Sequence, residues 1–272
     1  MKFAIIDGTG EYSDAKYDYD MAKSFCKQIH AQLPDSECHY ERGPSGEGYR
    51  VEERGQRAAD FLKTAGEKEK RYLAGYSRGG SAAIMAAEML EKDKIDVDAM
   101  FLFDPVARHL SHGGEVVPKN VKQLNVAYRR LDPALVNKYD YTIGTVFTVG
   151  NVLSSVNPAA AEAAKLTFSD TKVGNLFRDS WLDRAVNKPV AGIAHNPFRV
   201  FFGNTGKKYL GNSAAADYRT FSGTHGALGG VGWPHVSEDK LCEIEVASFM
   251  NEAFTKNGIS VELRSLLILN KT

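Results

Sequence analysis

Gly75-Tyr76-Ser77-Arg78-Gly79 places a serine between two glycines, where a short apolar run meets an alanine-rich segment. A motif of this kind between a strand and a helix is typical of a nucleophile elbow, a strained turn that exposes the serine hydroxyl. The glycines let strand and helix pack closely around the serine. We therefore expect Ser77 to be a nucleophile and the Arg78 amide to be one oxyanion donor. The alternative is a glycine-flanked serine in an ordinary strand–helix turn.

A serine nucleophile needs a histidine base. His225 lies in the glycine-rich loop Ser222–Gly230, directly after the strand-like residues Tyr218–Phe221. This loop position suits a catalytic histidine, so His225 is the preferred base. His235 is the second choice, and its position after Trp233-Pro234 suits a capping or packing role better.

The base needs an orienting acid, and two aspartates follow strand-like segments after Ser77. Asp104 closes the strand that comes next in the chain, and Asp132 closes the one after it. In folds with a nucleophile elbow, the position of Asp132 is used more often for the acid. Asp104, followed by Pro105, could also serve only to end its strand. Spacing alone leaves both acids open.

The elements around these residues alternate between strand and helix, which predicts an α/β fold with a mostly parallel sheet covered by helices on both faces. Helices are expected at Asp18–Leu33, Val51–Ala65 and Gly80–Leu90, and late in the chain at Ser237–Phe254 with Leu241, Ile244, Ala247 and Phe249 on its buried side. Strands are expected at Lys2–Ile6, Arg71–Ala74, Asp98–Phe103, Leu124–Tyr128, Arg199–Phe202 and Tyr218–Phe221.

We expect residues 1–272 to form a single domain. Residues 133–196 have the weakest sheet signal and are interpreted as a cap inserted over the sheet. Within them, Tyr141–Ala161 is a run of 21 residues without a charge. This run fits either a lid that touches lipid or a buried helix that covers the sheet.

Composition excludes several classes of protein. The chain has 34 Lys and Arg against 34 Asp and Glu, so it lacks the basic surplus expected of a nucleic-acid-binding protein. The start of the chain, Met1–Ile6, is too short an apolar run for a secretory signal, and no apolar run reaches the roughly 18 residues of a membrane span. We therefore expect a protein made in the cytoplasm, with no signal peptide and no transmembrane segment.

Neither a metal nor a cofactor is expected. His109 and His112 have helical spacing for a metal pair, but no carboxylate cluster stands beside them. Cys26, Cys38 and Cys242 are too widely spaced for a zinc motif, and their odd number argues against a disulfide framework.

Four segments in order carry a resemblance: Asp7-Gly8-Thr9-Gly10, Gly75-Tyr-Ser-Arg-Gly79, Phe103-Asp104-Pro-Val106 and Phe221-Ser-Gly-Thr-His225-Gly-Ala-Leu-Gly229-Gly230. Together they resemble the α/β-hydrolase family that includes the GxSxG phospholipase effectors of bacterial type VI secretion. The chain departs from the family at Tyr76, where phenylalanine is usual, at Pro105 and at Ala227, and it is much shorter than the large effectors.

The resemblance implies that Ser77, Asp104 and His225 form the triad, which favours Asp104 over Asp132. It also implies that an amide of Gly8 or Thr9 is the second oxyanion donor. The implied substrate is a lipid or phospholipid ester. Export through a secretion system that needs no signal peptide, with a carrier or immunity protein as partner, is a further hypothesis from the resemblance.

Other functions remain as alternatives. A small soluble ester, thioester or amide is the main rival substrate. A catalytically idle hydrolase fold used for binding is a second possibility, although candidates for all three catalytic roles are present in order. A dinucleotide-binding turn at Asp7–Gly10 is disfavoured, because Ser13 stands where the third glycine of that motif belongs.

Overall fold

The computed structural model describes residues 1–10, 14–44, 50–107, 113–129, 205–223, 225–231 and 237–265. The expected cap at 133–196, its uncharged run and the strand at 199–202 lie outside the described residues. So do the second-choice acid Asp132, the second-choice base His235, and the pair His109 and His112.

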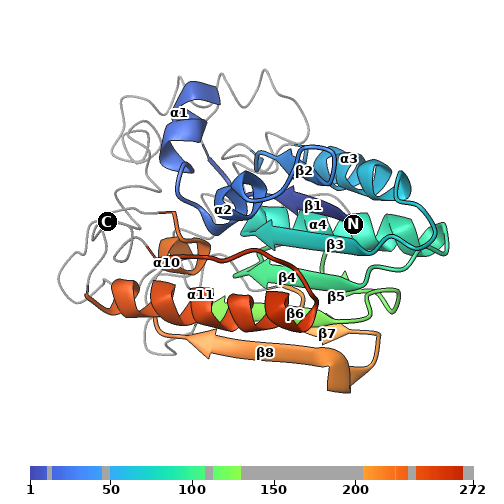
Figure 1. Cartoon of the computed structure of the whole chain (residues 1–272). Helices are drawn as coiled ribbons and strands as arrows, with labels where there is room; N and C mark the ends of the chain where they lie inside the picture. Colours follow the sequence, from blue (N-terminus) through green and yellow to red (C-terminus); the bar gives the residue numbers. More distant parts are fainter. Residues whose placement is uncertain are drawn as a thin grey trace, which may run out of the picture.

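A six-stranded sheet forms the centre of the molecule (Figure 1), in the order β2-β1-β3-β4-β6-β8. All five strand pairings are parallel, which confirms the predicted α/β class. The strands are β1 (Lys2–Ile6), β2 (Cys38–Glu41), β3 (Arg71–Tyr76), β4 (Ala99–Phe103), β6 (Leu124–Arg129) and β8 (Ala216–Phe221). Two short strands, β5 (Val116–Val117) and β7 (Lys208–Tyr209), pair separately.

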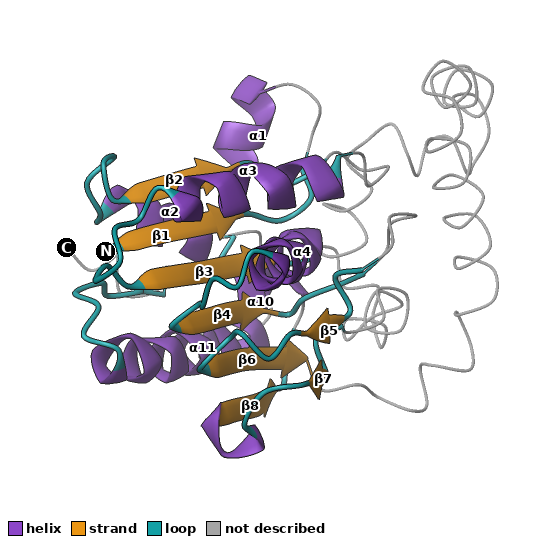
Figure 2. Ribbon diagram, turned by 90° about the vertical axis from the view of Figure 1, so that its right-hand side faces the viewer, coloured by secondary structure: helices purple, strands orange, loops and turns teal. Residues whose placement is uncertain are grey.

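Helices cover both faces of the sheet, as a buried parallel sheet requires (Figures 1 and 2). On one face lie α3 (Val51–Lys63) and α4 (Arg78–Lys92), which share a core with alternate strand residues. On the other face lie α2 (Phe25–Ala31) and α11 (Ser237–Lys256), together with the short α10 (His225–Gly229). Outside these layers are α1 (Asp14–Asp20) and a 3₁₀ turn at Ser213–Ala215. None of the described helices has the length and apolar composition needed to cross a bilayer.

The order of the strands indicates where in the sheet a binding site is expected. The chain passes from β1 to β2 on one side of β1 and then crosses to β3 on its other side, where the sheet continues to β4. The direction of sheet growth therefore reverses between β1 and β3. Crevices at such a reversal, outside the carboxyl ends of the strands, are where open α/β sheets bind ligands. Asp7 follows β1 and Ser77 follows β3, so both lie at this point.

The expected helix Asp18–Leu33 is wrong as a single helix, since the structure breaks it into α1 and α2. Ser24 caps α2 through its hydroxyl, which accepts from the Lys27 amide, and the same hydroxyl donates to Asp7. The apolar stripe runs across the break without interruption, so its periodicity alone does not reveal the cap. The sequence also gave no signal for β2, a short strand at the edge of the sheet.

The buried face of α11 differs from the expected one. Ala247 and Phe249 are buried as expected, but Leu241 is 58% exposed and Ile244 is 37% exposed. The helix carries apolar residues on more than one side, and the sheet selects one of the two possible stripes. The buried apolar residues are Cys242, Val246, Ala247, Phe249, Met250, Ala253 and Phe254.

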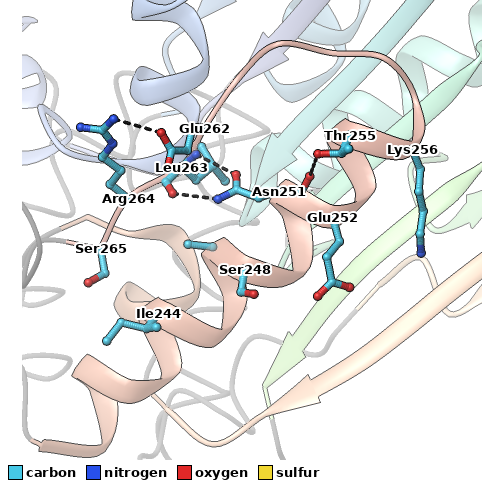
Figure 3. A pocket seen from close by; sticks show the side chains of 11 residues that line it. Ile244, Ser248, Asn251, Glu252, Thr255, Lys256, Glu262, Leu263, Arg264 and Ser265 are labelled. Carbon is cyan, nitrogen blue, oxygen red and sulfur yellow. Dashed lines mark hydrogen bonds and ion pairs between the residues drawn. The ribbon is translucent and has the colours of Figure 1, made fainter.

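An extended segment, Ile259–Ser265, follows α11 and lies between this helix and α2. Three amide side chains hold its backbone, each accepting from the N–H and donating to the C=O of one residue. Gln32 pairs with Glu262, Asn251 with Leu263, and Gln28 with Arg264. Figure 3 shows the Asn251 pair beside a groove of about 720 Å³ between α11 and this segment.

Candidate active site

The turn at Ser77 has the backbone geometry expected of a nucleophile elbow. Ser77 has φ 56° and ψ −129°, a conformation that costs a non-glycine residue about 1–3 kcal/mol. The neighbouring glycines are required by close backbone contacts. A Cβ on Gly75 would lie 2.7 Å from Gly80 Cα, and one on Gly79 would overlap the carbonyl groups of Ile6 and Asp7. Both glycines of the motif therefore have a steric cause.

The structure brings Ser77, Asp104 and His225 together, although 148 residues separate the serine from the histidine. His225 Nε2 lies 2.8 Å from Ser77 Oγ, and His225 Nδ1 lies 2.6 Å from Asp104 Oδ2. The side chains come from three elements: the end of β3, the end of β4 and the start of α10. This is the nucleophile–base–acid arrangement that transfers a proton away from a serine hydroxyl.

Asp104 has a further partner that the sequence analysis missed. Arg129, the last residue of β6, forms an ion pair through Nε with Asp104 Oδ2, and its amide donates to Asp104 Oδ1 at 3.3 Å. Both side chains are completely buried. The only local signal is an arginine at the end of an otherwise uncharged strand, because its partner lies 25 residues earlier in the chain.

Burial and charge set the protonation of the pair. Burial on its own would raise the pKa of Asp104, but the Arg129 guanidinium and the hydrogen bond from His225 outweigh it and hold that pKa below its usual value. Burial lowers the pKa of His225; Asp104 opposes this, while Arg129 and Arg78 add to the lowering. His225 is therefore neutral at pH 7, the form that can accept a proton.

Tyr76 connects the parts of the site. Its hydroxyl donates to the main-chain carbonyl of His225 at 3.0 Å, and its ring lies 4.8 Å from the imidazole. A Cβ on Gly8 or on Gly229 would overlap the Tyr76 ring. The ring thus fills the space between the loop after β1 and the helix that begins with His225. In the sequence, Tyr76 differs from the phenylalanine usual in the family that the chain resembles, and that difference gives no sign of this contact.

The two expected oxyanion donors after β1 differ in their hydrogen bonding. The Gly8 amide donates to Asp7 Oδ1 at 2.7 Å, so it is already engaged. The Thr9 amide has no acceptor among the described residues, and the buried Thr9 hydroxyl has no hydrogen-bond partner there either. Thr9 is therefore the better of the two donors expected after β1. Arg78 is the first residue of α4, so its backbone N–H lies at the N-terminal end of that helix, next to Ser77.

Asp7 holds the loop that carries Thr9. Its carboxylate is completely buried and accepts from Ser24 Oγ at 2.6 Å and from Tyr40 at 2.8 Å, besides the Gly8 amide. Burial raises the pKa of Asp7, although these hydrogen bonds oppose it. Tyr17 adds a contact to the same loop, since its hydroxyl donates to the Gly8 carbonyl at 2.9 Å.

Within the described part of the chain, no group of three His, Cys, Asp or Glu side chains is placed to hold a metal ion. The three cysteines are buried and unpaired with one another. The groove beside α11 contains none of the three triad residues in its lining.

No protein-family model, curated protein or solved structure matches this chain.

Proposed function

We propose that this protein is a serine hydrolase that cleaves carboxylic esters through an acyl-enzyme. The observation that carries the proposal is the continuous contact from Ser77 Oγ through His225 to Asp104, with the serine on a strained strand–helix turn. A buried serine used only for packing needs neither the strained turn nor a neutral imidazole aligned on its hydroxyl.

Acylation begins when Ser77 Oγ attacks the ester carbonyl carbon while His225 Nε2 takes the hydroxyl proton. Negative charge develops on the carbonyl oxygen, and the Thr9 and Arg78 amides stabilise it, each contributing about 3 kcal/mol. Asp104 stabilises the imidazolium and fixes which ring nitrogen faces the serine. The tetrahedral intermediate then collapses, and the leaving alkoxide receives the proton from Nε2.

Deacylation repeats these steps with water. His225 Nε2 takes a proton from a water molecule, whose oxygen attacks the acyl carbon. The second intermediate expels Ser77 Oγ, which regains its proton from Nε2, and a carboxylic acid leaves. Every proton moves between side chains of the chain, the substrate and water.

A lipid ester is our proposed substrate class. Support comes from the resemblance of the four sequence segments to the phospholipase effectors, and the rival is a small soluble ester. Comparison of phospholipid vesicles with a soluble p-nitrophenyl ester separates the two. Faster turnover on aggregated than on monomeric lipid supports the lipid; activity on the soluble ester alone contradicts it.

Fluorophosphonate labelling of the purified protein tests the catalytic assignment. We expect mass mapping to find the adduct on Ser77, and Ser77→Ala or His225→Ala to abolish it. Asp104→Asn should slow labelling by about 10⁴-fold, because the acid no longer holds the required tautomer. Ser81→Ala is the matched control: Ser81 is buried one turn further along α4 and donates to the Gly114 carbonyl at 2.8 Å.

The control variant should label at the wild-type rate. Absence of labelling in the folded wild type, or labelling that survives Ser77→Ala, would overturn the proposal.

A further inference from the structure

Asp104 is shared between the histidine and a permanent cation. His225 Nδ1 and Arg129 Nε meet the same oxygen, Oδ2, while the Arg129 amide takes Oδ1. An arginine side chain stays protonated in proteins. The acid of this site therefore already has a positive partner before the histidine acquires its proton.

We propose that Arg129 is a positioning residue of the site, which orients Asp104 toward His225 and keeps His225 available as a base under more acidic conditions than Asp104 alone would allow. This role rests on the proposed hydrolase function for its catalytic meaning. The contacts of Arg129 exist independently of that function.

Charge counting gives the direction of the effect. With Arg129 present, ionised Asp104 and neutral His225 make a buried group of zero net charge, and a further proton leaves a buried positive charge. Without Arg129, the same pair carries a net charge of −1, and a proton neutralises it. Burial disfavours net charge, so Arg129 makes proton uptake harder. The direction is the same whichever of the two side chains takes the proton.

Other charged and titratable groups lie on the elements around His225. Arg78 on α4 is buried and acts in the same direction as Arg129. Tyr76 on β3 contributes a neutral hydroxyl, and Tyr128 precedes Arg129 on β6. Cys242 and Glu243 are buried on α11, the helix that packs on α10. Of the charges acting on His225, those of Asp104, Arg129 and Arg78 are the largest.

Arg129 makes proton transfer from Ser77 to His225 less favourable, but it widens the pH range over which His225 is neutral. An imidazolium that shares its carboxylate oxygen with a guanidinium is stabilised less, so each proton transfer from Ser77 is less favourable. In return, the neutral base persists to lower pH. Arg129 also keeps the buried Asp104 ionised, which the histidine needs for its orientation.

The first test is an NMR titration of the His225 imidazole in the wild-type protein, with its resonances assigned by their loss in His225→Gln. We expect the pKa of His225 below the ordinary value of about 6.5. A value at or above it would overturn the proposal. This measurement needs neither substrate nor a variant at Arg129.

The second test uses the pH dependence of fluorophosphonate labelling at Ser77. Arg129→Gln should move the acid limb to higher pH by about one pH unit or more. Arg129→Lys keeps the charge and should leave the limb near its wild-type position. Arg71→Gln is the matched control, because Arg71 holds backbone carbonyls at the opposite end of β3. It should lower stability without moving the limb.

A lower rate in Arg129→Gln with an unmoved acid limb would mean a structural role only and would overturn the proposal. If Arg129→Gln does not fold, Arg129→Met replaces it in the labelling experiment, and a wild-type His225 pKa at or above about 6.5 still overturns the proposal. A protein that never labels at Ser77 would overturn the hydrolase function, and a His225 pKa that is higher in Arg129→Gln than in the wild type would retain the effect of Arg129.

Discussion

The hydroxyl of Tyr76 donates to the main-chain carbonyl of His225, across 149 residues of sequence. Tyr76 immediately precedes Ser77, so one residue holds the proposed base and is covalently joined to the proposed nucleophile. Its ring also fits against Gly8, in the loop that carries the candidate oxyanion donor Thr9. A displacement of this ring would disturb Ser77, His225 and the loop after β1 together.

Tyr76→Phe should slow labelling of Ser77 by about 5-fold, because a lost hydrogen bond of about 1 kcal/mol loosens the position of His225. Tyr72→Phe is the matched control. Its hydroxyl donates to the Asn257 carbonyl at 3.0 Å, at the other end of β3. Both variants should lose similar stability in urea unfolding, and only Tyr76→Phe should lose reactivity. Equal labelling rates in the two variants would contradict this role of Tyr76.

Gly79→Ala should destabilise the protein by about 2–3 kcal/mol or prevent folding, because its Cβ would overlap backbone at the end of β1. Gly66→Ala is the control. Its Cβ would meet only the Glu69 side chain, at 3.6 Å, and should change stability by less than about 0.5 kcal/mol. Urea denaturation of both variants makes the comparison, and similar midpoints would show that the elbow tolerates a side chain.

Glu41 should make stability fall in acid. Burial alone would raise its pKa, but hydrogen bonds from His39 and Arg57 lower it from 4.5 to about 2. The folded state therefore stabilises ionised Glu41 relative to the unfolded state. This contributes about 3 kcal/mol to the free energy of unfolding above pH 5. This stabilisation is lost as the pH falls from about 4.5 to 2.

Glu41→Gln should therefore be less stable than wild type at pH 6, and the difference should disappear near pH 2. Glu53→Gln is the control, since the exposed Glu53 approaches Arg57 only to 3.9 Å. Urea unfolding across this pH range measures both, and a difference for Glu41→Gln that does not change with pH would contradict the assignment.

Asp7 should act in the opposite direction. Burial raises its pKa in the folded state, so the folded protein binds that proton more tightly than the unfolded chain. The wild type should then lose stability as the pH rises above about 4 through the folded pKa. Asp7→Asn removes this dependence, so its stability relative to wild type should increase with pH. A relative stability that is flat or falls would contradict the raised pKa.

Local patterns were sufficient for the elements that carry the candidate triad. Ser77 is marked by a motif of five residues, and His225 follows a strand in a glycine-rich loop. The steric reason for Gly79 is not local, because it lies against backbone carbonyl groups at the end of β1. Gly229 in the loop of His225 also has a cause that only the fold reveals, since it makes room for Tyr76. The sequence pattern recorded the glycine without its reason.

Long-range electrostatics could not be predicted in the same way. Arg129 meets Asp104 because β4 and β6 are neighbours and Phe103 pairs with Ala127, which brings the ends of both strands together. No spacing rule relates the two positions along the chain. The Ser24 cap was hidden for a similar reason, because its second partner, Asp7, lies on another element.

The segment 262–264 is held through its backbone by hydrogen bonds with the amide side chains of Gln28, Gln32 and Asn251. These hydrogen bonds do not depend on side-chain identity, so most substitutions at the exposed Glu262 and Arg264 would leave the pairs intact, whereas the buried Leu263 is also constrained by the core. Proline is the exception, because each pair uses the backbone N–H. The position of this segment therefore depends on the three side chains that bind its backbone: Gln28, Gln32 and Asn251.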